Sequence, residues 1–214
     1  MPDSTSTVLL VDDHPLLRKG VRQLLELEDD IEVVGEAADG VNAVQQALLL
    51  DPDLILLDLS MKGMDGIETL VALRDADVSA RIVVFTVSDD RSDVVAALKS
   101  GADGYLLKDT EPEELVNSIR SACSGKMVLS AQLAEVLAMS LRENDKPQGR
   151  TLESLTRREL QILKYIAEGL SNKLIGRKLD IAEATVKVHV KHLMKKLSFR
   201  SRVEAAVWMV ELQK

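Results

Sequence analysis

The sequence predicts a doubly wound α/β domain with a five-stranded parallel sheet, followed by a smaller all-α domain of four helices. Five short apolar runs alternate with helical patterns through residues 7–124, and from Leu155 onward every apolar pattern has helical spacing. The charge changes at the same place. Residues 1–150 hold 14 Lys and Arg against 28 Asp and Glu, whereas residues 151–214 hold 13 against 7. Net charges of −14 and +6 indicate that the two halves have different partners.

The five apolar runs are rich in Val, Ile and Leu and predict strands buried on both faces. They are Thr7–Val11, Glu32–Ala37, Leu54–Leu57, Arg81–Phe85 and Gly104–Leu107. Between the runs, apolar residues recur at helical spacing in segments such as Leu16–Leu27, Val41–Leu50 and Val94–Lys99. Five such strand–helix units predict a parallel sheet with helices on both faces, which we assign to residues 1–124.

Residues 125–150 are expected to connect the two domains. Ser130–Arg142 has helical spacing and predicts a helix at about residues 130–142. Glu143–Arg150 is polar and contains Pro147 and Gly149, which is typical of a tether. The second domain then occupies residues 151–214.

Composition excludes several classes of protein. No uninterrupted apolar stretch reaches the roughly 18 residues of a membrane-spanning helix, so we expect no membrane insertion. The segment before the first strand lacks a basic region, so a signal peptide is not expected. The single cysteine, Cys123, cannot form an internal disulfide, which is typical of a reducing cytoplasm.

Residues 155–214 contain the start and stop signals of four helices. Thr156 and Glu159 have the spacing of a capping box at the start of the first helix, which Gly169 ends. Ser171 or Asn172 is suited to cap the second helix. The third and fourth helices are predicted at about Glu183–Leu197 and Arg202–Leu212.

Polar side chains follow four of the predicted strands, where ligands bind in an open parallel sheet. Asp12 and Asp13 follow the first strand, Asp58 the third, Thr86 ends the fourth, and Lys108 follows the fifth. Three carboxylates at one edge repel each other, and Mg²⁺ would relieve that repulsion. The lysine and the threonine hydroxyl suit the oxygens of a phosphoryl group. The sequence therefore predicts a Mg²⁺-dependent site that accepts a phosphoryl group on Asp58.

The third predicted helix of the second domain has two contrasting faces. One face is apolar and suited to packing, with Val186, Val190, Leu193 and Leu197. The other presents Val188 among three lysines, Lys187, Lys191 and Lys195. Together with the preceding helix, Asn172–Leu179, it forms a helix-turn-helix pattern inside the basic part of the chain. The sequence therefore predicts binding of double-stranded DNA through the major groove.

The segments VDDHP, LLDLSMKGMDG, VVFTVS and GADGYLLKD resemble the receiver domain of bacterial two-component response regulators, which has a flavodoxin-like fold. The resemblance covers residues 7–124 and implies that a sensor histidine kinase phosphorylates Asp58. It also implies that Thr86 and Lys108 contact the phosphoryl group and that Tyr105 is a switch residue. By the same resemblance, Mg²⁺ is held by Asp12, Asp13, Asp58 and the backbone carbonyl of Ser60. One departure is Lys62, where the family usually has proline.

The segment from Leu155 to Trp208 resembles the LuxR/FixJ-type DNA-binding domain. The resemblance implies base contacts by Lys187, Val188 and Lys191. It implies phosphate contacts by Arg177, Lys195, Arg200 and Arg202. It also implies a homodimer on DNA through the last helix, with Val203, Ala206, Val207 and Val210. The stretches KVHVKH and VEAAVW are similar to the nitrate/nitrite-responsive members of this family, although a paralogue with a different signal remains an alternative.

These features lead us to expect a phosphoacceptor that regulates transcription and has no enzymatic turnover of free substrates. In the unphosphorylated state the acidic domain would cover the recognition helix, and phosphorylation would release it. An aspartate-nucleophile phosphatase is one alternative, but it would need a second aspartate where this chain has Ser60. A small-molecule-sensing regulator is another. Its pocket would be apolar and aromatic, whereas residues 1–124 contain one Phe and one Tyr.

Overall fold

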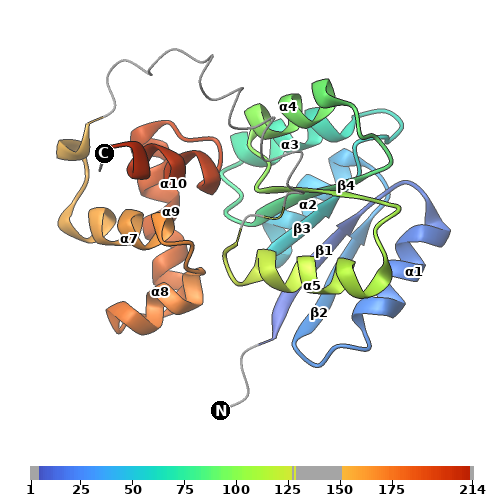
Figure 1. Ribbon diagram of the computed structural model, residues 1–214, viewed down its shortest axis with the longest axis horizontal. Helices are drawn as coiled ribbons and strands as arrows, with labels where there is room; N and C mark the ends of the chain where they lie inside the picture. Colours follow the sequence, from blue (N-terminus) through green and yellow to red (C-terminus); the bar gives the residue numbers. More distant parts are fainter. Residues whose placement is uncertain (1–4, 127, 129–150, 213–214) are drawn as a thin grey trace.

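A computed structural model of the chain describes residues 5–126, 128 and 151–212, which form an N-terminal α/β domain and a C-terminal helical domain (Figure 1). The predicted helix at 130–142 and the predicted tether at 143–150 lie outside the described residues. Val128, at the start of the predicted connection, forms a parallel bridge with Gly104. The N-terminal domain is therefore extended by at least this residue.

The N-terminal domain contains a five-stranded, all-parallel sheet with the order β2-β1-β3-β4-β5. All five predicted strands are confirmed, with boundaries that agree to within one residue. The inner strands β1, β3 and β4 are almost wholly buried, which explains their uninterrupted apolar runs. The strands are β1 (Ser6–Val11), β2 (Ile31–Ala37), β3 (Leu54–Leu57), β4 (Arg81–Thr86) and β5 (Gly104–Leu107).

Five helices cover the sheet, two on one face and three on the other (Figure 1). α1 (Pro15–Leu25) and α5 (Pro112–Cys123) share a face. The opposite face carries α2 (Gly40–Leu50), α3 (Gly66–Asp75) and α4 (Arg91–Ser100). Successive residues of a strand point to opposite faces, so Leu9 and Val11 enter one core whereas Val8 and Leu10 enter the other. The predicted doubly wound fold is confirmed.

The C-terminal domain packs four α-helices around one core, as predicted. A short 3₁₀ turn, η1 (Leu152–Ser154), precedes them. The predicted capping box of Thr156 and Glu159 is present, and Ser171 caps the second helix. Phe199 and Trp208 pack edge to face, with ring centroids 5.4 Å apart. The helices are α7 (Arg157–Ala167), α8 (Asn172–Leu179), α9 (Glu183–Leu197) and α10 (Arg202–Glu211).

The two ends of the parallel sheet face different neighbours. The carboxyl ends of the strands carry the residues of the predicted acidic site. The amino ends follow the C-termini of α2 to α4 and face the C-terminal domain, which lies beside this edge (Figure 1). Within the part of the chain that the structure describes, no helix has the length and apolar character needed to cross a membrane.

Candidate functional site

The predicted carboxylates meet at the carboxyl edge of the sheet. Backbone hydrogen bonds between neighbouring parallel strands place them there. The Asp12 N–H donates to the Ala37 carbonyl, and the Asp58 N–H donates to the Val11 carbonyl. Asp12 and Asp58 are buried, whereas Asp13 lies at the rim of the pocket. The sequence prediction that these three residues converge is therefore confirmed, because the strand order forces their strands to end side by side.

Lys108 reaches into this group of carboxylates from the end of β5. Its Nζ lies 2.7 Å from Asp58 Oδ2 and 2.8 Å from Asp12 Oδ2. The Lys108 N–H also donates to the carbonyl of Thr86, which holds the ends of β4 and β5 together. Thr86 itself is fully buried. The structure thus brings a carboxylate, a lysine ammonium and a threonine to one end of the sheet, as a phosphoryl-accepting site requires.

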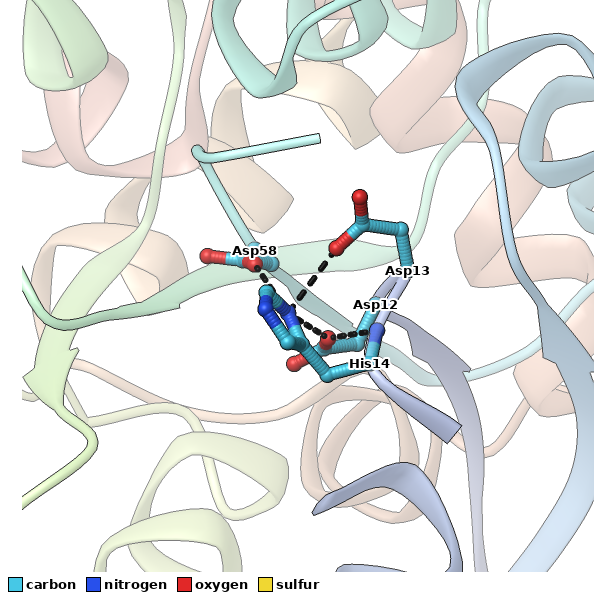
Figure 2. A group of neighbouring side chains, drawn as sticks. All are labelled: Asp12, Asp13, His14 and Asp58. Atoms are coloured by element: carbon cyan, nitrogen blue, oxygen red, sulfur yellow. Dashed lines mark hydrogen bonds and ion pairs between the residues drawn. The ribbon is translucent and has the colours of Figure 1, made fainter. Parts of the chain in front are cut away.

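His14 also belongs to this pocket, and sequence reasoning gave it no role. Figure 2 shows its ring turned toward the three carboxylates. Its Nδ1 lies 2.9 Å from Asp13 Oδ1, 3.2 Å from Asp12 Oδ1 and 4.0 Å from Asp58 Oδ2. The only signal in the sequence is that His14 directly follows two aspartates, and such proximity does not fix where a side chain points.

The donor atoms of the pocket fit a metal ion. One atom from each of Asp12, Asp13, His14 and Asp58 lies within 4.8 Å of the others. Oxygen donors dominate, which suits a hard divalent cation. The backbone N–H of Ser60 donates to Asp58 Oδ1, so Ser60 lies beside Asp58, and the role of its carbonyl as a metal ligand stays a prediction. The N–H of Lys62 lies 3.4 Å from Asp13 Oδ2, a contact that proline could not make.

Tyr105 is connected to the same edge through the loop after β4. Its hydroxyl donates to the Ser88 carbonyl at 2.8 Å, and the Ser88 N–H approaches the Thr86 hydroxyl at 3.4 Å. Burial, reinforced by the charge of Asp93, raises the pKa of Tyr105 to about 12. The phenol is therefore neutral and acts as a donor over the physiological pH range.

The second predicted site, the basic face of α9, is turned toward the N-terminal domain. The apolar face is buried in the core, as predicted. Lys187 Nζ lies 3.2 Å from Asp51 Oδ2 and 3.4 Å from Asp53 Oδ1, and Lys191 Nζ lies 3.5 Å from Asp77 Oδ2. These contacts keep Lys187 partly buried, and nearby Asp53 and Asp51 raise its pKa against the opposing effect of burial.

The aspartates that meet α9 stand where helices end. Asp51 is the left-handed C-cap of α2, and Asp77 has φ of 58° just after α3. The C-terminus of a helix carries partial negative charge, which adds to that of the carboxylate. Lys187 contacts both kinds of group, since its Nζ also donates to the Asp51 carbonyl at 3.3 Å. The amino edge of the sheet therefore carries negative charge that complements the positive charge of a basic helix.

The other predicted DNA-contacting residues are placed differently. Val188, Lys195 and Arg200 are exposed, and so is Arg177 on α8, which also has an interaction partner. Arg202, in contrast, points inward and donates to Asn172 Oδ1 at 2.8 Å and to the Leu170 carbonyl. In this arrangement Arg202 braces its own domain, so its predicted contact with phosphate would require both hydrogen bonds to break.

The predicted dimer residues lie along α10. Ala205 and Met209 form the buried side of this helix. Ala206 packs partly against the core, and Val210 is 43% exposed. Val203 and Val207 are half-buried, so the predicted face lies mostly outside the core of its own domain, and its role in dimerisation stays a prediction.

Comparison with protein families identifies both domains. The model of the response regulator receiver domain matches residues 8–120. The model of bacterial regulatory proteins of the luxR family matches residues 153–209. These ranges fall inside the two domains delimited from the sequence.

Comparison with individual proteins gives the same result. The nitrate/nitrite response regulator NarL of Escherichia coli K12 is 59% identical over 204 residues, which are 95% of this chain and 94% of that protein. NarP of the same strain is 50% identical over 212 residues, 99% of this chain and 98% of that protein. Among solved structures, the response regulator ChrA of a heme-sensing two-component system is 34% identical, with a TM-score of 0.52 and 99% of both chains covered. The chain therefore belongs to the response regulators in which a receiver domain is joined to a LuxR-family DNA-binding domain.

Proposed function

We propose that this protein is a transcription regulator that a sensor histidine kinase activates by phosphorylating Asp58, in the control of nitrate- and nitrite-responsive genes. One observation supports the mechanism: the basic face of α9 is paired with receiver carboxylates, while Asp58 and Lys108 of the proposed phosphoacceptor pocket lie together at the opposite edge of the sheet. The assignment of nitrate and nitrite rests on the similarity to NarL and NarP.

The chemistry of the pocket follows from its geometry. A carboxylate oxygen of Asp58 attacks the phosphorus of a phosphohistidine, the phosphorus–nitrogen bond breaks, and the imidazole leaves with a proton. Lys108 already lies 2.7 Å from Asp58 Oδ2 and would pair with a phosphoryl oxygen. Asp12, Asp13 and Asp58, with the Ser60 carbonyl, would hold Mg²⁺, which when bound neutralises negative charge on the transferring group.

The state of the pocket can reach Tyr105 through the loop after β4. A phosphoryl group on Asp58 would accept a hydrogen bond from the Thr86 hydroxyl, which in this structure lies near the Ser88 N–H. Any movement of Ser88 changes the hydrogen bond from the Tyr105 hydroxyl to its carbonyl. The proposed switch therefore consists of Thr86, Ser88 and Tyr105 acting together.

The unphosphorylated form cannot place α9 in a major groove, because receiver carboxylates occupy the basic face. DNA phosphates and the aspartates at positions 51, 53 and 77 compete for the same lysines. Phosphorylation would shift the equilibrium toward an open form, which dimerises through α10 on paired half-sites. A nearly complete switch requires a differential stabilisation of about 5 kcal/mol.

We further propose that the protein acts stoichiometrically, as a phosphoacceptor that can lose its phosphoryl group but does not turn over free phosphate esters. The pocket has Ser60 where an aspartate-nucleophile phosphatase would have a second aspartate. We place the protein in the cytoplasm, in keeping with its single cysteine. The solved structure described as RcsB dimers bound to DNA, 25% identical to this chain with a TM-score of 0.57, supports the dimeric arrangement.

The proposal is tested by Asp58→Asn. This change keeps the size of the side chain and removes the nucleophilic carboxylate, so we expect no label from radioactive acetyl phosphate and no gain in promoter affinity on incubation with the phosphodonor. Asp29→Asn is the matched control, since Asp29 is an exposed carboxylate in the turn before β2. Labelling of Asp58→Asn at the rate of the unmodified protein would rule out Asp58 as the phosphoacceptor.

A further inference from the structure

The main chains of the receiver and the DNA-binding domain lie close together at Gly125. A β-carbon placed on Gly125 would overlap the carbonyl oxygen of Gly169 and lie 2.8 Å from both the Leu170 carbonyl carbon and the Ser171 nitrogen. Real β-carbons do not approach backbone atoms this closely. The main chain after α5 therefore packs directly against the main chain of the turn between α7 and α8, and only glycine permits this contact.

Hydrogen bonds hold the main chain on both sides of this contact. On the receiver side, Arg81 Nη2 donates to the Gly125 carbonyl at 2.9 Å. On the other side, Arg202 donates to the Leu170 carbonyl. Arg81 is 9% exposed and Arg202 is partly buried, and burial lowers the pKa of both side chains. Because these hydrogen bonds hold both backbones, neither segment can shift locally without weakening a buried or a partly buried hydrogen bond.

A second glycine repeats the arrangement at the end of α4. A β-carbon on Gly101 would lie 2.7 Å from the Arg200 carbonyl oxygen and 3.2 Å from Arg74 Cγ. The Arg74 side chain is itself fixed, since it donates to the Gly101 carbonyl at 2.9 and 3.0 Å and pairs with Asp103 at 2.7 Å. We call Gly101 and Gly125 the contact glycines.

Helix capping alone does not account for the contact glycines. Both have left-handed backbone angles, with φ of 108° at Gly101 and 107° at Gly125, and such angles favour glycine at the end of a helix. Gly63 and Gly169 also have left-handed angles, but a β-carbon on either would meet no atom within 4 Å. Contact with the other domain is thus a second reason for glycine at these positions. Mutation can separate this steric effect from the preference for glycine at a left-handed backbone angle.

Elsewhere the two domains are held together weakly. A cleft of about 680 Å³ lies between them, lined by charged residues from both sides. The ion pairs across it involve partly exposed side chains, such as Asp51 at 65% and Lys191 at 45% exposure. Pairs of this kind contribute little to stability, since solvent screens them. A methyl group at a contact glycine would overlap backbone atoms of the other domain. Separation of the two domains would therefore relieve that overlap most easily.

We propose that Gly101 and Gly125 set the closed state of this protein, because the absence of a side chain at these positions allows the DNA-binding domain to dock on the amino edge of the sheet. A side chain at either position holds the domains apart and exposes α9 without phosphorylation. This inference rests on the proposed function in one respect, the masking of DNA-binding residues in the closed form. The contact glycines lie near the amino ends of β4 and β5, whereas Thr86 and Lys108 lie at the carboxyl ends. The six residues of β4 span about 16 Å between these two edges.

The test compares Gly125→Ala and Gly101→Ala with Gly63→Ala in the full-length, unphosphorylated protein. Gly63→Ala also places a side chain at a left-handed backbone angle, φ of 82°, but without a contact, so it controls for local destabilisation. Small-angle X-ray scattering reports the radius of gyration, which is about 17 Å for a single compact body of 214 residues. We expect an increase of several ångströms, on the order of a fifth, for the contact-glycine variants and none for Gly63→Ala. Circular dichroism and labelling of Asp58 by acetyl phosphate show that the receiver remains folded.

Promoter affinity is measured on the same variants as a second readout. We expect both contact-glycine variants to bind about tenfold more tightly than the unmodified protein, which corresponds to about 1.4 kcal/mol of lost docking energy. A radius of gyration unchanged in both folded variants overturns the role of the contact glycines, whatever the proposed function. Expansion without any gain in affinity upholds the role of the glycines in closure and contradicts the proposed masking of α9. If Gly125→Ala does not fold, Gly101→Ala decides the outcome alone.

Discussion

The Tyr105 side chain packs in the core of the receiver and also places its hydroxyl against the loop after β4. It is 1% exposed, and its one described hydrogen bond runs from the hydroxyl to the Ser88 carbonyl. Most of the side chain packs in the core between the sheet and α4, so only the hydroxyl is sensitive to the position of the loop after β4. In the proposed switch the residue would respond to the pocket through this one polar atom, while its ring stabilises the fold.

Replacement of Tyr105 by Phe should lower the free energy of unfolding by about 1 kcal/mol at neutral pH, because the Ser88 carbonyl loses its donor. The pH dependence should change as well. The pKa of Tyr105 is raised from 10.0 to about 12, so its contribution to stability is fully present below pH 10 and is lost as the pH rises toward 12. Denaturant unfolding between pH 9 and 12 should thus show a shallower loss in Tyr105→Phe than in the unmodified protein.

Tyr165→Phe, which removes a hydroxyl from the other domain, serves as the control for this series. An identical alkaline loss of stability in Tyr105→Phe and in the unmodified protein would mean that the phenol of Tyr105 does not titrate differently on folding.

At the scale of the element, α9 has an apolar face that packs in the core of its own domain and a lysine face that contacts a separate, anionic surface. Val186 and Leu193 are fully buried, so they hold the helix in register against α7 and α8. The lysine face carries no such constraint and pairs with whichever anionic surface is adjacent. The same side chains can therefore serve the receiver in one state and DNA phosphates in another.

Lys191→Ala should weaken promoter binding by the phosphorylated protein and reduce the dependence of log affinity on log salt concentration by about one unit. Fluorescence anisotropy at several salt concentrations measures both quantities. Lys164→Ala, on the exposed side of α7, removes an equal charge outside the helix-turn-helix and should leave the slope unchanged. Equal slopes in Lys191→Ala and the unmodified protein would remove α9 from the DNA interface.

At the scale of the whole molecule, the acidic pocket and the surface that meets the DNA-binding domain lie at opposite edges of one sheet. The carboxyl edge holds the proposed phosphoacceptor pocket, and the amino edge holds the aspartates and glycines that meet the DNA-binding domain. β4 and β5 connect the two edges directly, since Arg81 and Thr86 are the ends of one strand. Among the described residues, these strands give a change at Asp58 a direct route to the docking surface.

The acidic docking surface leads to a prediction for the double variant Asp51→Asn, Asp77→Asn. Loss of two ion pairs to α9, each worth up to about 1 kcal/mol, should raise promoter affinity of the unphosphorylated protein by about three- to tenfold. The affinity of the phosphorylated protein should stay unchanged, since docking is then already released. Mobility-shift titrations of both forms measure the two effects. Glu113→Gln, an exposed charge at the start of α5, is the control, and equal gains in both variants would refute a local role for the docking aspartates.

Residue spacing along the chain predicted the five strands, the four C-terminal helices with the caps of α7 and α8, and the convergence of the acidic residues. These patterns are local, and in a parallel sheet local patterns suffice to bring Asp12, Asp58 and Lys108 to one edge, because the carboxyl ends of all the strands lie along that edge. The opposite charges of the two domains also predicted that one would cover the other.

Only the tertiary structure decided which atoms meet. It turned His14 toward the carboxylates, paired Lys187 with Asp51, and brought Gly125 against Gly169. It also directed Arg202 into its own domain, where the sequence had suggested contact with phosphate. The physical reason is that these contacts depend on side-chain rotamers and on the docking of two surfaces distant in the chain, and neither is encoded in the spacing of residues along one strand or helix.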